Sequence, residues 1–173
     1  MMLDETKILI KDSCILFDLL DLNLVNEFFT LDYEIYTTPQ VISEITNEAQ
    51  LEIINGFVLN RKLKIDKEGS FESIQDLSEN YPGLSFTDCS VLELAIRLDG
   101  VILSADRTLR NTAIRNSLKV KGMLWIINLL IETGVISDET ALEKIKLYPL
   151  VNKRAPLKEL NEFCITLASR CSS

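Results

Sequence analysis

The sequence contains no histidine, and this absence excludes several classes of enzyme. Histidine is the usual general base of serine and cysteine hydrolases and the commonest protein ligand of transition metals. The four cysteines, Cys14, Cys89, Cys164 and Cys171, form no C-x-x-C pair, so a zinc site is disfavoured and free thiols in a reducing compartment are expected. Any hydrolytic chemistry would therefore depend on carboxylates, hydroxyls, lysine or a hard cation.

Long hydrophobic runs are also absent, because no apolar stretch approaches the roughly 20 residues that span a bilayer. The first residues, MMLDETK, are acidic where a signal peptide is basic, so we expect a cytoplasmic protein without a membrane segment. Glycine and proline are scarce, with 6 and 4 among 173 residues, whereas 47% of the residues are hydrophobic. This composition predicts a single folded domain over residues 1–173. The net charge of −8 argues against a protein that coats nucleic acid with its whole surface, but a local basic face is compatible with it.

Short β-type runs alternate with helical patterns along the whole chain. Strands are expected at 7–11, 34–37, 63–66, 101–104 and 118–120. One or two helices are expected within 13–30, and further helices from Pro39 and at 49–59, 70–79, 86–98, 107–116, 123–132, 138–148 and 157–169. The alternation predicts an α/β sandwich around a short, mainly parallel sheet, with additional C-terminal helices over about 138–169.

Four acidic residues fall where such a sheet collects ligands, beyond the carboxyl ends of strands and near helix N-termini. Asp12 follows the first strand and Asp106 the fourth, Asp88 is in the first turn of the 86–98 helix, and Glu44 is about five residues into the helix that begins at Pro39. Each has a structural alternative. Asp12 and Asp106 could cap helices, Ser85 and Asp88 fit a capping box, and Glu44 could be an ordinary solvated helix residue.

The segments that carry these acids are ILIKDSCILFDLL, TTPQVISEI, LSFTDCSVLELA and VILSADRTLR. They resemble, in order and spacing, the four acidic motifs of PIN-domain ribonucleases, a family that includes the VapC-like toxins of toxin–antitoxin pairs. The resemblance covers nearly the whole chain and extends to KVKGMLWIINLLIETGVIS. It implies a PIN-like three-layer α/β sandwich, hydrolysis of RNA, and a catalytic, metal-binding quartet of Asp12, Glu44, Asp88 and Asp106.

The chemistry of this quartet suits Mg²⁺ or Mn²⁺, which prefer oxygen ligands and need no histidine. Such ions activate water and stabilise charge on an attacked phosphodiester. Without a metal, the clustered carboxylates would repel one another and raise at least one pKa. The hydroxyls of Ser13, Thr87 and Ser104 flank the acids and are expected either to bond the carboxylates and their waters or to cap helices. Cys14 and Cys89 are interpreted as small core residues.

A basic segment follows the last acid, because no acidic residue occurs between Arg107 and Ile131. Its cations are Arg107, Arg110, Arg115, Lys119 and Lys121. Phosphate contacts supply much of the affinity for nucleic acids, so Arg107, Arg110 and Arg115 are candidate RNA-binding residues. The alternative is an ordinary solvated helix face.

Two other functions compete with a metal-dependent endoribonuclease. One is a catalytically silent PIN-like scaffold that binds RNA or protein. The other is a phospho-acceptor receiver domain, which expects a pair of acids at the first strand where Lys11-Asp12 supplies one. The chain of 173 residues is longer than compact VapC-like toxins, so its C-terminal helices are expected to hold an antitoxin, form a homodimer or complete the core.

Overall fold

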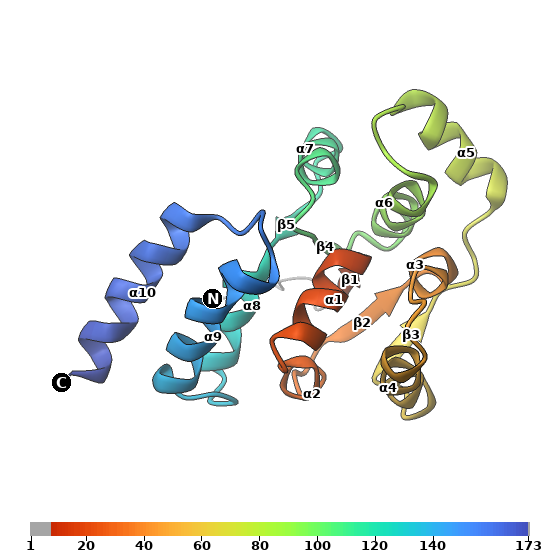
Figure 1. The fold of residues 1–173 in the computed structure, drawn as a ribbon. Coiled ribbons are helices and arrows are strands. Elements are labelled where there is room, and N and C mark those ends of the chain that lie inside the picture. The colour runs from red at the N-terminus through yellow and green to blue at the C-terminus, as the bar shows by residue number, and fades with distance from the viewer. Residues whose placement is uncertain (1–7, 173) are drawn as a thin grey trace, which may run out of the picture. The chain divides into compact units, whose positions relative to one another are not determined.

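A computed structural model describes residues 8–172 as short parallel strands and helices in alternation (Figure 1). The strands are β1 (Ile8–Lys11), β2 (Glu34–Thr37), β3 (Leu63–Ile65), β4 (Val101–Leu103) and β5 (Val120–Lys121). The helices are α1 (Ser13–Asp21), α2 (Val25–Phe28), α3 (Pro39–Ser43), α4 (Glu48–Leu59), α5 (Phe71–Asn80), α6 (Phe86–Leu98), α7 (Arg107–Arg115), α8 (Met123–Glu132), α9 (Asp138–Val151) and α10 (Leu157–Cys171).

The five strands form one sheet in the order β3-β2-β1-β4-β5. Every neighbouring pair is parallel, and in register Ile10 lies opposite Tyr36 on one side and Ile102 on the other. All carboxyl ends therefore meet at one edge, where ligands bind in sheets of this kind. The predicted α/β fold with a short parallel sheet is confirmed.

Several helices begin where a polar side chain satisfies an unpaired amide of the first turn. Thr38 accepts from the Val41 amide at the start of α3, and Ser85 accepts from the Asp88 amide at the start of α6. Ser137 does the same for Thr140 at the start of α9. Such caps each stabilise a helix by about 1 kcal/mol, which explains why these boundaries could be predicted closely.

Within 13–30, where one or two helices were expected, the structure has two, α1 and α2, because Asn23 adopts a positive φ of 53° between them. Two other elements differ from the prediction. β5 begins at Val120 and not at 118, since Ser117 has a φ of 60° and the Leu118 amide still bonds the Ala113 carbonyl of α7. The helix from Pro39 ends at Ser43, which makes Glu44 its C-cap residue and not an interior one.

The chain divides into two compact units, and the first contains the sheet. This unit consists of the described residues up to Ile15 together with Asp32–Lys121. Within it α6 packs against β1 and β4, and also against α3, α5 and α7. Val91, Leu92 and Ala95 of α6 are completely buried, so this helix is central to the core of the unit.

The second unit consists of Leu16–Leu31 and the chain from Gly122 onward. In it α8 packs against α2 and α9, and α9 packs against α10, so the C-terminal helices contribute to a core of their own. Buried Asp18 of α1 accepts hydrogen bonds from the Tyr148 hydroxyl at 3.0 Å and from Asn152 Nδ2 at 3.0 Å. None of the helices in the described part of the chain combines the length and hydrophobicity that a membrane-spanning segment needs. The assignment of residues 1–173 to a single domain stays a prediction.

Candidate metal centre

Asp12 lies directly beyond β1 and is a buried carboxylate, with 2% of its surface exposed. Its amide bonds the Leu103 carbonyl at 3.2 Å, which extends the pairing of β1 with β4 by one residue. Its carboxylate accepts from Ser104 Oγ at 2.6 Å and Cys14 Sγ at 3.1 Å on Oδ2, and from Ser13 Oγ at 3.3 Å on Oδ1. These donors are neutral, so they hold the side chain in place without cancelling its charge.

Ser104 connects Asp12 to the loop that carries Asp106. The Ser104 hydroxyl, which is completely buried, donates to Asp12 and accepts from the Asp106 amide at 3.0 Å. The Ser104 carbonyl accepts from Arg110 Nη1 at 2.8 Å. Ser104 and Ser13 therefore both bond the Asp12 carboxylate, and their role beside a metal ligand stays a prediction.

Asp106 and Asp88 both act as helix caps. Asp106 Oδ1 accepts from the Leu109 amide at 2.8 Å at the start of α7. Asp88 Oδ2 accepts from the Ser85 amide at 3.1 Å, while Ser85 Oγ accepts from the Asp88 amide at 3.0 Å, which forms a capping box. The structural alternative is therefore present for these two acids, but a carboxylate has about four acceptor positions, so capping does not prevent metal binding.

The charges of three acids interact at this edge of the sheet. Burial raises the pKa of Asp88 above its ordinary value, and the negative charges of Asp12 and Asp106 raise it further, against the hydrogen bonds of Ser85, which lower it. The direction of this shift agrees with repulsion among the acids, but burial is its larger cause, so repulsion within the full quartet stays a prediction. Glu44 is exposed at the end of α3, the helix that packs beside α6.

A hard divalent cation fits the chemistry of this donor set, although the cluster is not closed around one point. The donors are carboxylate oxygens, and a cation would offset the burial and the neighbouring negative charges that raise the pKa of Asp88. Among residues 8–172, no three acidic or cysteine side chains are arranged to ligate one ion as they stand. Ligation by Asp12, Glu44, Asp88 and Asp106 therefore requires rotation of side chains and stays a prediction.

Comparison with known proteins places the chain in a family. A family model described as "DUF3368: PIN domain" matches residues 8–149. The chain belongs to the PIN-domain family. The resemblance seen in the sequence is therefore confirmed at the level of the family, and a receiver domain is excluded. PIN domains are typically nucleases and generally use divalent metal ions.

Solved structures similar to the chain include the following two, and the first of them supports the fold. PAE2754 from Pyrobaculum aerophilum matches with a TM-score of 0.51 and 14% identity, over 74% of this chain and 97% of that chain. A PilT N-terminus domain protein, SSO1118 from Sulfolobus solfataricus P2, matches with a TM-score of 0.43 and 12% identity, over 72% of this chain and 94% of that chain. A search of curated proteins gave no significant match.

Cys14 is a contact of the candidate site that the sequence did not reveal. It was expected to be a small core residue, but this half-buried thiol bonds Asp12 and accepts from the Ala105 amide at 3.4 Å. Burial, and next the charge of Asp12, raise the pKa of Cys14 to about 12. The thiol therefore stays protonated at neutral pH and acts as a donor, not as a nucleophile. Its position two residues after Asp12 was the available signal.

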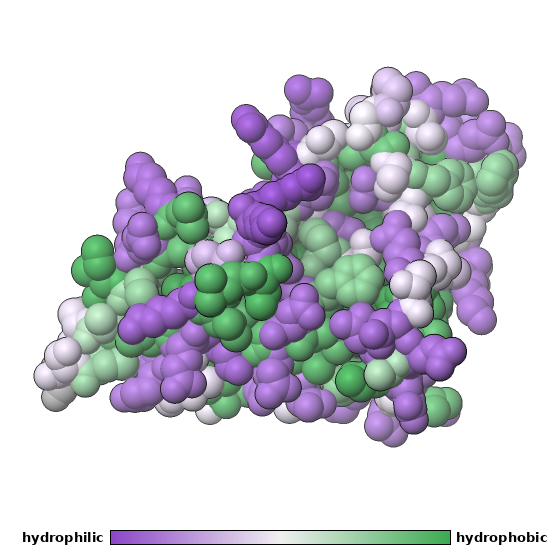
Figure 2. Space-filling view, viewed as in Figure 1, coloured by the Kyte–Doolittle hydropathy of each residue, from purple (hydrophilic) through white to green (hydrophobic). Residues whose placement is uncertain are grey.

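The predicted RNA-binding arginines of the PIN domain lie on α7 in different environments. Arg107 and Arg115 are exposed, whereas Arg110 is half-buried and holds the Ser104 carbonyl. Figure 2 shows a hydrophilic surface over α7. Thr87 accepts from Ser90 Oγ at 2.6 Å through its backbone carbonyl, so a contact of its hydroxyl with the acids stays a prediction.

Proposed function

We propose that this PIN domain is an endoribonuclease that hydrolyses RNA phosphodiester bonds with Mg²⁺ or Mn²⁺. The PIN-domain family, to which the chain belongs, consists generally of nucleases. The observation that carries the proposal is the position of Asp88: burial is the largest cause that raises the pKa of its carboxyl, and the nearby charges of Asp12 and Asp106 raise it further. A bound cation would stabilise a carboxylate whose charge is disfavoured by burial and by two neighbouring acids, which is why this arrangement supports a metal site.

Asp12, Glu44, Asp88 and Asp106 would hold the metal. A bound divalent cation supplies an activated water and stabilises the negative charge that develops on the phosphodiester. Ser104 and Cys14 fix the direction of the Asp12 carboxylate, which limits the rearrangement needed on binding. Glu44 would approach from the end of α3.

The RNA backbone would approach over α7, immediately beyond Asp106. Arg107 and Arg115 are exposed and can contact phosphates, whereas Arg110 also supports the loop at Ser104. Loss of Arg110 should therefore affect both RNA binding and stability.

The test is cleavage of single-stranded RNA in Mn²⁺ or Mg²⁺ by the wild type and by Asp12→Ala. Asp21→Ala, which changes an exposed aspartate at the end of α1, is the matched control. The wild type and Asp21→Ala should cut, Asp12→Ala should lose most of the activity, and EDTA should stop cleavage. Equal cleavage by wild type and Asp12→Ala would refute the proposal.

The second candidate function is a PIN-like scaffold that binds RNA or protein without cutting. It is favoured by the open arrangement of the acids, since no three acidic or cysteine side chains in residues 8–172 are positioned to bind one ion. A wild type that binds RNA but does not cut in either metal would support this alternative.

We further propose that the protein acts in the cytoplasm as the toxin of a toxin–antitoxin pair, with an antitoxin or a second copy as partner. The second unit exposes hydrophobic side chains along α9 and α10, namely Leu150, Leu157 and Ile165. Exposed hydrophobic groups that gather into one patch are typical of partner surfaces, so the proposal requires these side chains to act together. Expression of the wild type in bacteria should arrest growth and Asp12→Ala should not; unimpaired growth with both would contradict the toxin role.

A further inference from the structure

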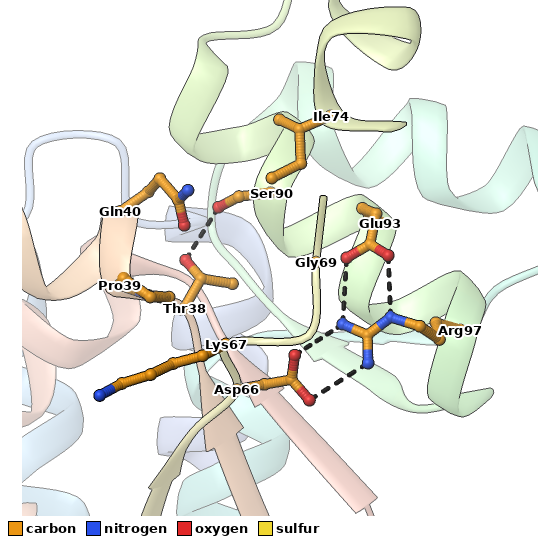
Figure 3. Close-up of a pocket in the computed structure, with 10 residues that line it drawn as sticks. All are labelled: Thr38, Pro39, Gln40, Asp66, Lys67, Gly69, Ile74, Ser90, Glu93 and Arg97. Atoms are coloured by element: carbon orange, nitrogen blue, oxygen red, sulfur yellow. Dashed lines mark hydrogen bonds and ion pairs between the residues drawn. The ribbon is translucent and has the colours of Figure 1, made fainter. Parts of the chain in front are cut away.

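A cavity of about 330 Å³ lies in the first unit (Figure 3), and none of the four acids is among the residues that line it. Its walls come from the start of α3, the segment after β3, α5 and α6, and they include Thr38, Gln40, Asp66, Ser90, Glu93 and Arg97. Thr38 follows β2 just as Asp12 follows β1, and these two strands are neighbours in the sheet. The cavity and the candidate metal centre therefore share one sheet edge.

The charges in the cavity are already paired. Arg97 bonds Asp66 at 2.6 and 3.2 Å and Glu93 at 2.8 and 3.1 Å, so one guanidinium is held between two carboxylates (Figure 3). Lys67 is exposed, and its ammonium points away from this cluster in Figure 3. Because its arginine is bound twice, the cavity is poorly suited to a phosphate, and because its carboxylates share a cation, it is poorly suited to a metal.

The polar groups at the opposite wall are neutral. Thr38 and Ser90 are buried and their hydroxyl oxygens are 2.8 Å apart. Ser90 donates to the Thr87 carbonyl, so the Thr38 hydroxyl must donate to Ser90, and both hydroxyl hydrogens are consumed within the protein. The half-buried Gln40 amide lies beside this pair and carries both a donor and an acceptor (Figure 3).

An exposed aromatic pair lies along the same helices. Phe71 and Phe86 are 68% and 36% exposed, and their ring centroids are 5.4 Å apart. Phe71 precedes the cavity residue Ile74 by three positions on α5, and Phe86 precedes Ser90 by four on α6, so each shares a helix face with a wall of the cavity. Exposed aromatic rings beside a nuclease site are surfaces on which unpaired bases stack.

We propose that this cavity binds one unpaired base of the RNA next to the cleavage site, with Gln40 bonding the edge of the base. Phe71 and Phe86 stack a neighbouring base. A base is neutral and planar, and it can both donate and accept hydrogen bonds. These properties match a cavity in which the charges are paired and the Gln40 amide offers both a donor and an acceptor. The identity of the ligand as RNA rests on the proposed nuclease function, whereas the choice of base over phosphate rests on the cavity alone.

The test is selection from a pool of single-stranded RNA with randomised sequence, bound in EDTA so that no cleavage occurs, followed by sequencing of the retained RNA. The wild type should enrich one base at one position by about fivefold, the size expected for one net hydrogen bond. Gln40→Ala should abolish this enrichment, whereas Gln50→Ala, which changes a half-buried glutamine on α4 outside the cavity, should retain it. Phe71→Ala should weaken overall affinity by about fivefold or more and keep the base preference.

Two results would overturn the proposal. One is a pool in which the wild type enriches no base. The other is a Gln40→Ala variant that melts at the wild-type temperature and still enriches the same base to the same extent. The measurement needs no metal. Enrichment without cleavage would therefore contradict only the nuclease function, and cleavage without enrichment would contradict only the base cavity.

Discussion

Replacing Ser104 with alanine removes one hydroxyl that serves two groups of the candidate metal centre. This hydroxyl donates to Asp12 Oδ2 at 2.6 Å and accepts from the Asp106 amide at 3.0 Å. Ser104 is completely buried and Asp12 is 2% exposed, so bulk water is poorly placed to replace the lost oxygen. Ser104→Ala should therefore destabilise the protein even without metal or RNA.

The size of this effect follows from the two lost bonds. A hydrogen bond to a charged group contributes about 1.5–3 kcal/mol, and an unsatisfied buried donor costs about 1–3 kcal/mol. Because one hydroxyl makes both bonds, the two contributions do not simply add, and we expect a total of about 3 kcal/mol. In a chain of this size each kcal/mol lowers the melting temperature by about 2–4 °C, so a decrease of about 6–12 °C is expected.

The assay is thermal melting in EDTA, with Ser13→Ala as the matched control. Ser13 bonds the same carboxylate, but over 3.3 Å and from a half-buried position, so its loss should change the stability by less than about 1 kcal/mol. A melting temperature for Ser104→Ala within about 2 °C of the wild type would refute the argument that this hydroxyl holds the site together.

Three other predictions concern electrostatics, RNA and the second unit. Asp88→Asn should raise the melting temperature of the metal-free protein at neutral pH, because burial and the neighbouring acids raise the pKa of Asp88 and its charge destabilises the fold. The gain should vanish as the pH falls below the unfolded pKa of about 4, and an Asp88→Asn protein less stable than the wild type at neutral pH would contradict the reasoning. Arg107→Ala should weaken RNA binding and reduce the slope of log affinity against log salt by about 0.7, measured by fluorescence anisotropy; an unchanged slope would remove Arg107 from the RNA path. Tyr148→Phe should cost about 1.5–3 kcal/mol in urea unfolding, because buried Asp18 loses its hydroxyl donor, and a loss below about 0.5 kcal/mol would refute the role of that bond.

Local features of the fold were predictable because local interactions determine them. The starts of α3 and α6 could be predicted from Thr38 and Ser85, because each of these residues caps the helix that directly follows it in the sequence. The strand at 34–37 was located correctly, since a short apolar run between turn residues has few alternatives. The position of Asp12 beyond β1 then follows from the alternation of strands and helices, whereas the strand order β3-β2-β1-β4-β5 was not predicted.

Features that depend on distant segments could not be predicted. The cavity combines Thr38, Asp66, Ser90 and Arg97 from three separate stretches of chain, and no spacing in the sequence relates them. Contacts between Asp18 and residues 148 and 152 are equally remote. Glu44 was placed inside a helix because the pattern after Pro39 continues apolar, whereas the helix ends after one turn.

The central claim is that the acids at the carboxyl edge of the sheet bind a divalent cation, and calorimetric titration of Mn²⁺ into EDTA-treated protein tests it most directly. The wild type should bind Mn²⁺ saturably, Asp12→Asn should lose most of this affinity, and Asp21→Asn, an exposed aspartate outside the site, should keep it. Absence of saturable binding by the wild type, or equal binding by Asp12→Asn, would contradict the claim.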